Sequence, residues 1–115
     1  MWIMTQHGFL SVVKKTPGDN LTVRARRLDD IQYAAKQMGV KKKDILKNAG
    51  TDYKYRIVVS QAAFAQFMTQ ETLSIDYSNF KNAACAGDKK RHDAYFGCWE
   101  ALYRMQEVTE GKKLS

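Results

Sequence analysis

Hydrophobic positions in the first quarter of the chain are grouped as in two short β-strands. Residues 9–13 and residues 21–26 are rich in β-branched and apolar side chains. Pro17, Gly18 and two residues that tolerate turn geometry lie between them. The pattern predicts a β-hairpin, to which residues 2–4 offer a further short strand.

The hydrophobic spacing then changes to that of a helix. Apolar residues recur at intervals of three and four positions, at Leu28, Ile31, Ala35 and Met38. Asp29 and Asp30 fall in the first turn, where the helix dipole favours negative charge, and Gly39 is a suitable end. Residues 45–46 are ambiguous between a strand and a helical turn.

The second half of the chain predicts one more strand and then helices. Residues 53–59 have the composition of a strand, and Ser60 is a suitable N-cap for a helix that carries Phe64 and Phe67. From residue 78 to residue 108 the pattern is helical, with a break at Gly87 and a helix N-cap at Asp88.

This order of elements predicts an α+β fold in a single domain, residues 1–110, followed by a frayed basic tail, residues 111–115. We expect a two-layer sandwich in which an antiparallel sheet has helices on one face, with a long C-terminal helix. With 115 residues the chain is long enough for one such core and short for two ordinary domains.

Charge is distributed unevenly between the two halves. The chain has a formal net charge of +7, and residues 1–56 carry twelve basic and five acidic side chains, whereas residues 57–115 carry seven of each. The whole excess therefore lies in the first half, which favours a polyanionic partner for that half. An ordinary solvated basic face would have the same composition, so this alternative stays open.

Strand alternation predicts where part of this charge lies. In residues 21–26, Val23 and Ala25 share one face, with Arg24 and Arg26 on the other. In residues 53–59, the residues Tyr53, Tyr55, Ile57 and Val59 share a face, with Lys54 and Arg56 opposite. If the apolar rows face the helices, four cations gather on the open face of the sheet, at Arg24, Arg26, Lys54 and Arg56. This face resembles a nucleic-acid-binding platform, but we expect it to lack outward aromatic rings for base stacking.

A second pattern competes with this interpretation. Residues 35–45 resemble the helix-turn-helix of phage repressors, with Ala35, Gly39, Val40 and Ile45 at its small, turn and apolar positions. The resemblance implies a helix-turn-helix within residues 31–48, whose recognition helix, residues 41–48, begins with three lysines: Lys41, Lys42 and Lys43. Lysine discriminates bases poorly because it lacks a bidentate fork.

Catalytic and metal-binding patterns are missing from the sequence. His7 and His92 are the only histidines, and neither has zinc-ligand spacing to Cys85 or Cys98. We interpret both cysteines as reduced packing residues, and we expect no enzyme activity, no cofactor and no metal. The aromatic residues of the C-terminal part are predicted to be helix core: Tyr77, Phe80, Tyr95, Phe96, Trp99 and Tyr103.

Several strings together resemble a group of small bacterial and phage-borne proteins. They are residues 1–2 with Thr5, 8–9, 11–13, 23–26, 52–53 with 55–56, 75–77 with 79–81, and 91–92 with Tyr95, Trp99 and Leu102. The chain departs from the group at Asn48 and Ala49, where such proteins have Thr-Pro. The resemblance implies one compact domain and no particular chemistry.

These observations predict a small basic binding module that contacts nucleic acid or another polyanionic surface through its N-terminal half. An interaction protein that inhibits a host protein, and a helix-turn-helix regulator, are the alternatives. The sequence has no secretory signal and no apolar run that would span a membrane, so we expect a cytoplasmic protein without a membrane partner.

Overall fold

The computed structural model describes residues 1–48 and 52–111, and it divides into two compact units, Met1–Asp76 and Tyr77–Ser115. All but the first residue of the predicted C-terminal tail lies outside the described residues. The α+β class, the antiparallel sheet and the long C-terminal helix are confirmed. None of the helices in residues 1–48 and 52–111 has both the length and the hydrophobicity needed to cross a membrane.

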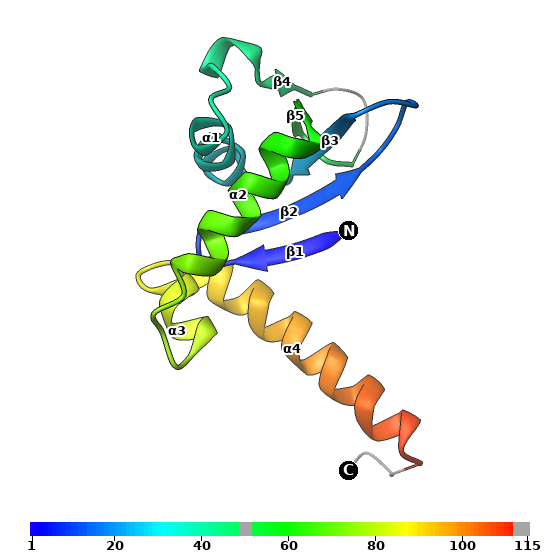
Figure 1. Ribbon diagram of the computed structural model, residues 1–115. Helices are drawn as coiled ribbons and strands as arrows, with labels where there is room; N and C mark the ends of the chain where they lie inside the picture. Colours follow the sequence, from blue (N-terminus) through cyan, green and yellow to red (C-terminus); the bar gives the residue numbers. More distant parts are fainter. Residues whose placement is uncertain (49–51, 112–115) are drawn as a thin grey trace. The chain divides into compact units, whose positions relative to one another are not determined.

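The first unit is built on a five-stranded sheet (Figure 1). Its strands are β1 (Trp2–Thr5), β2 (Gly8–Val13), β3 (Asn20–Ala25), β4 (Leu46–Lys47) and β5 (Tyr55–Ser60). They lie in the order β1-β2-β3-β5-β4, and every neighbouring pair is antiparallel. The predicted hairpin is therefore β2–β3, and the short strand at the N-terminus extends it on one side.

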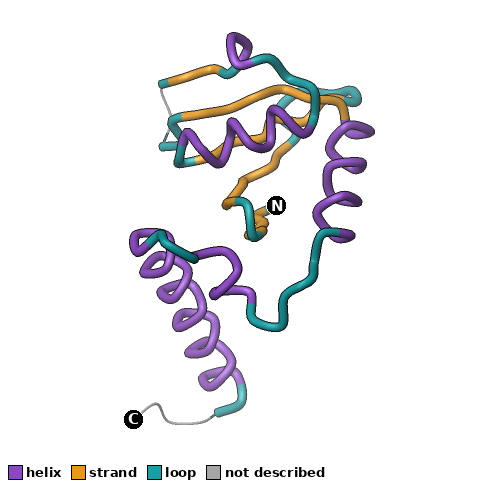
Figure 2. Tube along the Cα trace, turned by 90° about the vertical axis from the view of Figure 1, so that its left-hand side faces the viewer, coloured by secondary structure: helices purple, strands orange, loops and turns teal. Residues whose placement is uncertain are grey.

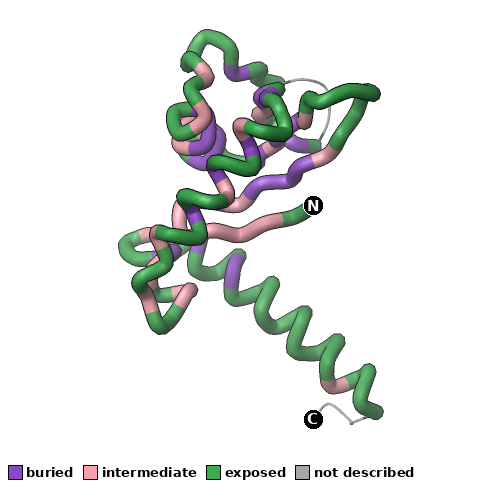
Figure 3. The backbone as a smooth tube through the Cα atoms, viewed as in Figure 1, coloured by how far each residue is buried: buried purple, intermediate pink, exposed green. Residues whose placement is uncertain are grey.

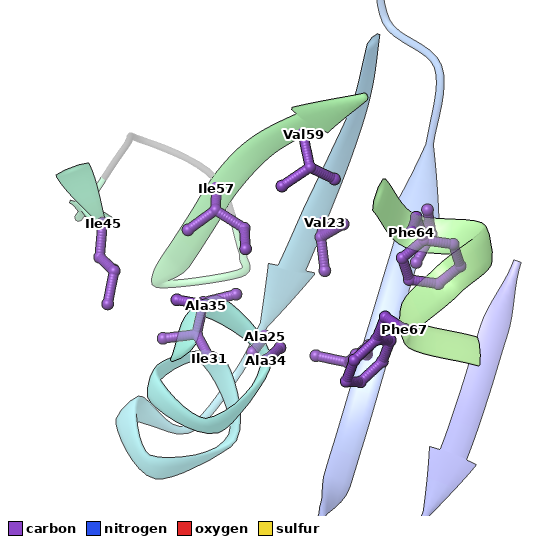
Figure 4. Close-up of a cluster of buried hydrophobic side chains, with 12 residues drawn as sticks. Val23, Ala25, Ile31, Ala34, Ala35, Ile45, Ile57, Val59, Phe64 and Phe67 are labelled. Carbon is purple, nitrogen blue, oxygen red and sulfur yellow. The ribbon is translucent and has the colours of Figure 1, made fainter. Parts of the chain in front are cut away.

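Two helices cover one face of this sheet, α1 (Leu28–Gln37) and α2 (Gln61–Leu73). Figure 2 shows α1 running along the strands. Val23, Ile57 and Ile31 are fully buried at the centre of the core. Phe64 and Phe67 of α2 close the same core beside the strands (Figure 4). Burial of these apolar side chains is the main source of stability for the two layers.

Local signals set where the helices begin. The Ser60 hydroxyl accepts a hydrogen bond from the Ala63 amide at 3.1 Å, which confirms the predicted N-cap of α2. Asp29 and Asp30 lie in the first turn of α1, as expected. Asp30 has a further role, because it is buried and its carboxylate accepts a hydrogen bond from the Phe9 amide at 3.0 Å. This bond fastens the β1–β2 hairpin to α1.

The predicted helix-turn-helix is wrong. After α1 the chain forms only the three-residue 3₁₀ helix η1 (Lys42–Asp44), and Ile45 is then buried in the core. Strand β4 follows at once and pairs with β5. The ambiguity at residues 45–46 is thereby settled, because Ile45 is a core residue and Leu46 begins a strand. A recognition helix has no room here, because pairing with the sheet and burial of Ile45 hold this segment extended.

The second unit contains α3 (Phe80–Cys85) and α4 (Lys89–Thr109). The Asp88 carboxylate accepts a hydrogen bond from the Arg91 amide at 3.0 Å, so the predicted break and N-cap are confirmed. Cys85 is buried as predicted, but Cys98 is exposed. The prediction of an all-core aromatic set is also wrong: Phe96, Trp99 and Tyr103 are 42%, 50% and 47% exposed. Figure 3 shows that most of α4 is exposed.

Candidate functional site: the open face of the sheet

One transverse row of side chains crosses the face that α1 and α2 leave uncovered. Register places Trp2 opposite Ser11, Ser11 opposite Arg24, Arg24 opposite Arg56, and Arg56 opposite Leu46. Cross-strand partners share a face and neighbouring strands lie about 4.8 Å apart, so the row places two cations in the middle of the sheet. The strand positions on this face that the structure describes include no acidic residue.

Arg24 is held in place from two sides. Its Nη2 donates a hydrogen bond to the buried Ser11 hydroxyl at 2.7 Å, and its guanidinium carbon lies 4.6 Å from the centre of the Tyr53 ring. Its Nε is buried without a hydrogen-bond partner among the described residues. Arg56 is half-buried beside it on β5. Because Arg24 and Arg56 are cross-strand partners, their like charges repel, and an anion on the open face would relieve that repulsion.

Tyr53 does not lie on the helix-facing side of the sheet, where strand alternation predicted it. It lies before the start of β5, and its ring is 4% exposed beneath the two arginines, with the Arg26 guanidinium carbon 4.2 Å from the ring centre. Arg26 also forms an exposed ion pair with Asp52 at 3.4 Å. The Tyr53 ring therefore brings Arg24 and Arg26 together through cation–π contacts.

Two aromatic residues face the open side, contrary to the expectation that it would have none. Trp2 is 74% exposed, and its ring makes an edge-to-face contact with Phe9 at 6.1 Å. Trp2 belongs to the same transverse row as Arg24, two strands away. The alternation within residues 2–5 could have revealed this, because Trp2 and Ile3 must face opposite sides and Ile3 packs against the core.

The remaining predicted cations are not all brought to this face. Lys54 is exposed just before β5, where its carbonyl accepts a hydrogen bond from the Asn48 amide at 2.7 Å. The three lysines of the rejected recognition helix are exposed around η1: Lys41, Lys42 and Lys43. Lys41 and Lys42 line a hollow of about 450 Å³ together with α1, on the helix-covered side of the sheet. The lysines are therefore separate from the arginine row.

The structure forms a polar cluster that the sequence did not predict, made of His7, Tyr33 and Glu71. His7 Nδ1 lies 2.9 Å from a carboxylate oxygen of Glu71, which is 7% exposed, and the imidazole stacks on Tyr33 at 4.2 Å. Burial, together with the hydrogen bond and the negative charge of Glu71, raises the pKa of Tyr33 to about 12.

The cluster joins the β1–β2 turn to both helices. Two hollows border α1; Tyr33 lines one of them, and neither His7 nor Glu71 lines either. We interpret the cluster as a structural tie. The spacing in the sequence does not predict this cluster, because Tyr33 lies 26 positions after His7 and Glu71 lies 38 positions after Tyr33.

The open face therefore offers positive charge and aromatic surface together. No group of three His, Cys, Asp or Glu side chains within residues 1–48 and 52–111 is placed to hold a metal ion. No protein-family model, curated protein or solved structure matches this chain, so its function must be argued from its own geometry.

Proposed function

We propose that this protein binds single-stranded nucleic acid on the open face of its sheet. The observation that carries the proposal is the transverse row, which places Arg24 and Arg56 side by side with the exposed Trp2 on the same face. Single-stranded nucleic acid needs this combination, because its phosphates bind cations while its unpaired bases stack on aromatic rings. A net charge of +7 strengthens the attraction at long range.

Each group has a distinct role in the proposal. The guanidinium groups of Arg56 and Arg26 contact phosphates through their fork of donors. Trp2 receives a base, and Phe9 supports the tryptophan ring from its edge. Arg24 is fixed by Ser11 and Tyr53, so it presents its charge with little loss of side-chain entropy on binding.

Fluorescence anisotropy with labelled oligodeoxythymidine and oligouridine tests the proposal. We expect the binding constant to fall steeply as salt rises, with a log–log slope of about −0.7 for each phosphate contact. A double substitution, Arg26→Gln with Arg56→Gln, should weaken binding and make the slope shallower by about 1.4. Trp2→Ala should weaken binding by about 5- to 150-fold and leave the slope unchanged, because stacking releases no counterions.

The lysines around η1 provide a control of equal charge. Lys41→Gln with Lys42→Gln also removes two positive charges, but from the helix-covered side of the sheet, so it should change affinity much less. Equal losses from the two double variants would show that only net charge matters and would overturn the proposal. Absence of binding, or binding that ignores salt, would do the same. Competition by polyglutamate together with indifference to Trp2→Ala would indicate an acidic protein surface instead.

A further inference from the structure

Helix α4 extends far beyond the helix that covers its beginning. Six residues of α3 span about 9 Å, whereas the 21 residues of α4 span about 31 Å. The buried residues of α4, Arg91 and Tyr95, both lie in its first two turns, where Tyr95 stacks on Phe80 at 5.7 Å. Beyond Tyr95, α3 reaches the same side of α4 through the Lys81 ammonium group, which lies 5.2 Å from the centre of the Phe96 ring and 5.0 Å from that of Trp99. Both rings nevertheless stay exposed, at 42% and 50%.

The exposed side of α4 beyond Tyr95 is apolar and continuous. The rings of Phe96, Trp99 and Tyr103 stack along it, with centres 5.7 Å and 5.5 Å apart. Leu102, which is 60% exposed, continues the surface. An apolar side of this extent marks an interaction surface, because a free monomer rarely leaves so many large side chains in water.

The charges of α4 indicate the orientation of its partner. Its first turn contains Lys89, Lys90 and Arg91 and no acidic residue, and its last turn contains Glu107 and no basic residue. This order adds to the helix dipole, which is positive at the N-terminal end and negative at the C-terminal end. The N-cap Asp88 offsets the charge of Arg91, with which it forms an ion pair at 3.6 Å. The charges of Lys89, Lys90 and Glu107 are unfavourable for the helix alone and attractive to a neighbour that runs in the opposite direction.

We propose that α4 pairs with α4 of a second copy of this chain, antiparallel, through the apolar side that contains Trp99 and Leu102. Lys89 and Glu107 are eighteen positions apart, which is about five full turns, so both lie on the same side of α4. In an antiparallel pair centred near Cys98, Lys89 of each copy meets Glu107 of the other. A parallel pair would place Lys89 beside Lys89 and Glu107 beside Glu107, so like charges would repel.

Lys89 already has an ion pair with Asp93 within its own helix, at 2.8 Å. Both side chains are strongly exposed, at 86% and 62%, and exposed pairs of this kind contribute little. The pair therefore does not oppose a contact between Lys89 and the second copy. The helix also has the interval of three between Trp99 and Leu102 that a helix–helix seam uses.

Sedimentation velocity of the full-length chain from about 1 µM to about 1 mM tests the proposal. We expect a reversible monomer–dimer equilibrium. Trp99→Glu should raise the dissociation constant by about 30-fold or more, as for a central interface tryptophan. Ala101→Glu adds the same charge to the opposite side of α4 and should leave the dissociation constant unchanged.

The orientation is tested by exchanging charges. Lys89→Glu and Glu107→Lys should each weaken the dimer, and the two together should restore it. Circular dichroism checks that each variant keeps its helices. A monomer over the whole range, equal effects of Trp99→Glu and Ala101→Glu, or single charge variants without effect would overturn the proposal. So would a monomer in which Trp99 is shielded from iodide, because the same chain would then cover this side. These measurements need no nucleic acid, so their outcome is independent of the proposed function.

Discussion

Replacement of Gly8 by alanine tests the contact that fastens the β1–β2 hairpin to α1. Gly8 has a φ of +146°, and a Cβ added there would lie 2.5 Å from Cγ of Asp30. The new methyl group cannot be accommodated unless Asp30 moves, and that movement breaks its hydrogen bond with the Phe9 amide. The substitution therefore combines backbone strain with the loss of a buried polar contact.

The cost of Gly8→Ala has two parts. The unfavourable φ costs about 1–3 kcal/mol for a residue with a side chain. Loss of the bond between Asp30 and Phe9 deprives the part-buried Phe9 amide of this acceptor, at a further cost of about 1–3 kcal/mol. We expect Gly8→Ala to lower the free energy of unfolding by about 2–6 kcal/mol, measured by urea denaturation with circular dichroism.

Two comparisons isolate the contact with Asp30. Gly18 has a φ of +112° and open space around it, so Gly18→Ala should cost only the backbone part. In an Asp30→Gly background, which removes the obstructing atoms, Gly8→Ala should also cost only that part. If Gly8→Ala and Gly18→Ala lower stability equally, the close approach of Gly8 to Asp30 is refuted. Because the hairpin carries Trp2, Gly8→Ala should also weaken the proposed binding of nucleic acid.

Two further predictions concern titratable groups. The pKa of Tyr33 is about 12 in the folded chain against an ordinary value of 10.0, so the unfolded chain releases this proton first as pH rises. The free energy of unfolding should therefore fall more steeply between pH 10 and pH 12 than in the Tyr33→Phe variant; parallel curves from urea titrations would contradict this. Burial raises the pKa of the Cys85 thiol, whereas Cys98 is exposed. Ellman's reagent should accordingly label one thiol rapidly in the native protein, and Cys98→Ser should abolish that rapid phase; a rapid phase that survives would contradict the assigned burial.

Elements governed by neighbouring residues were predictable from the sequence. The hairpin follows from the Pro-Gly turn between two β-branched segments, and the caps at Ser60 and Asp88 follow from side chains that reach amides three positions ahead. The pairing of Arg24 with Arg56 was only half predictable. Alternation assigns each to a face, but the register that sets them opposite each other is a long-range property.

Long-range packing decided the features that the sequence analysis missed. Residues 35–45 fit a helix-turn-helix locally, yet burial of Ile45 and pairing of β4 with β5 keep the segment extended. The ring of Tyr53 lies beneath two arginines because the chain departs from strand geometry before β5 begins. In α4, helical spacing identifies the apolar side. It does not show that α3, with six residues, is too short to cover that side along all 21 residues of α4.

The sequence by itself determined the class of the fold, the positions of its turns and caps, and the excess of positive charge in its first half. These depend on φ preferences, short hydrogen bonds and side-chain alternation, all of which act over a few residues. Only the tertiary structure decided that Trp2 joins the arginine row, that the η1 lysines lie apart from it, and that His7 meets Glu71. Those contacts join residues far apart in the chain, and the strand register and packing that create them exist only once the core has formed.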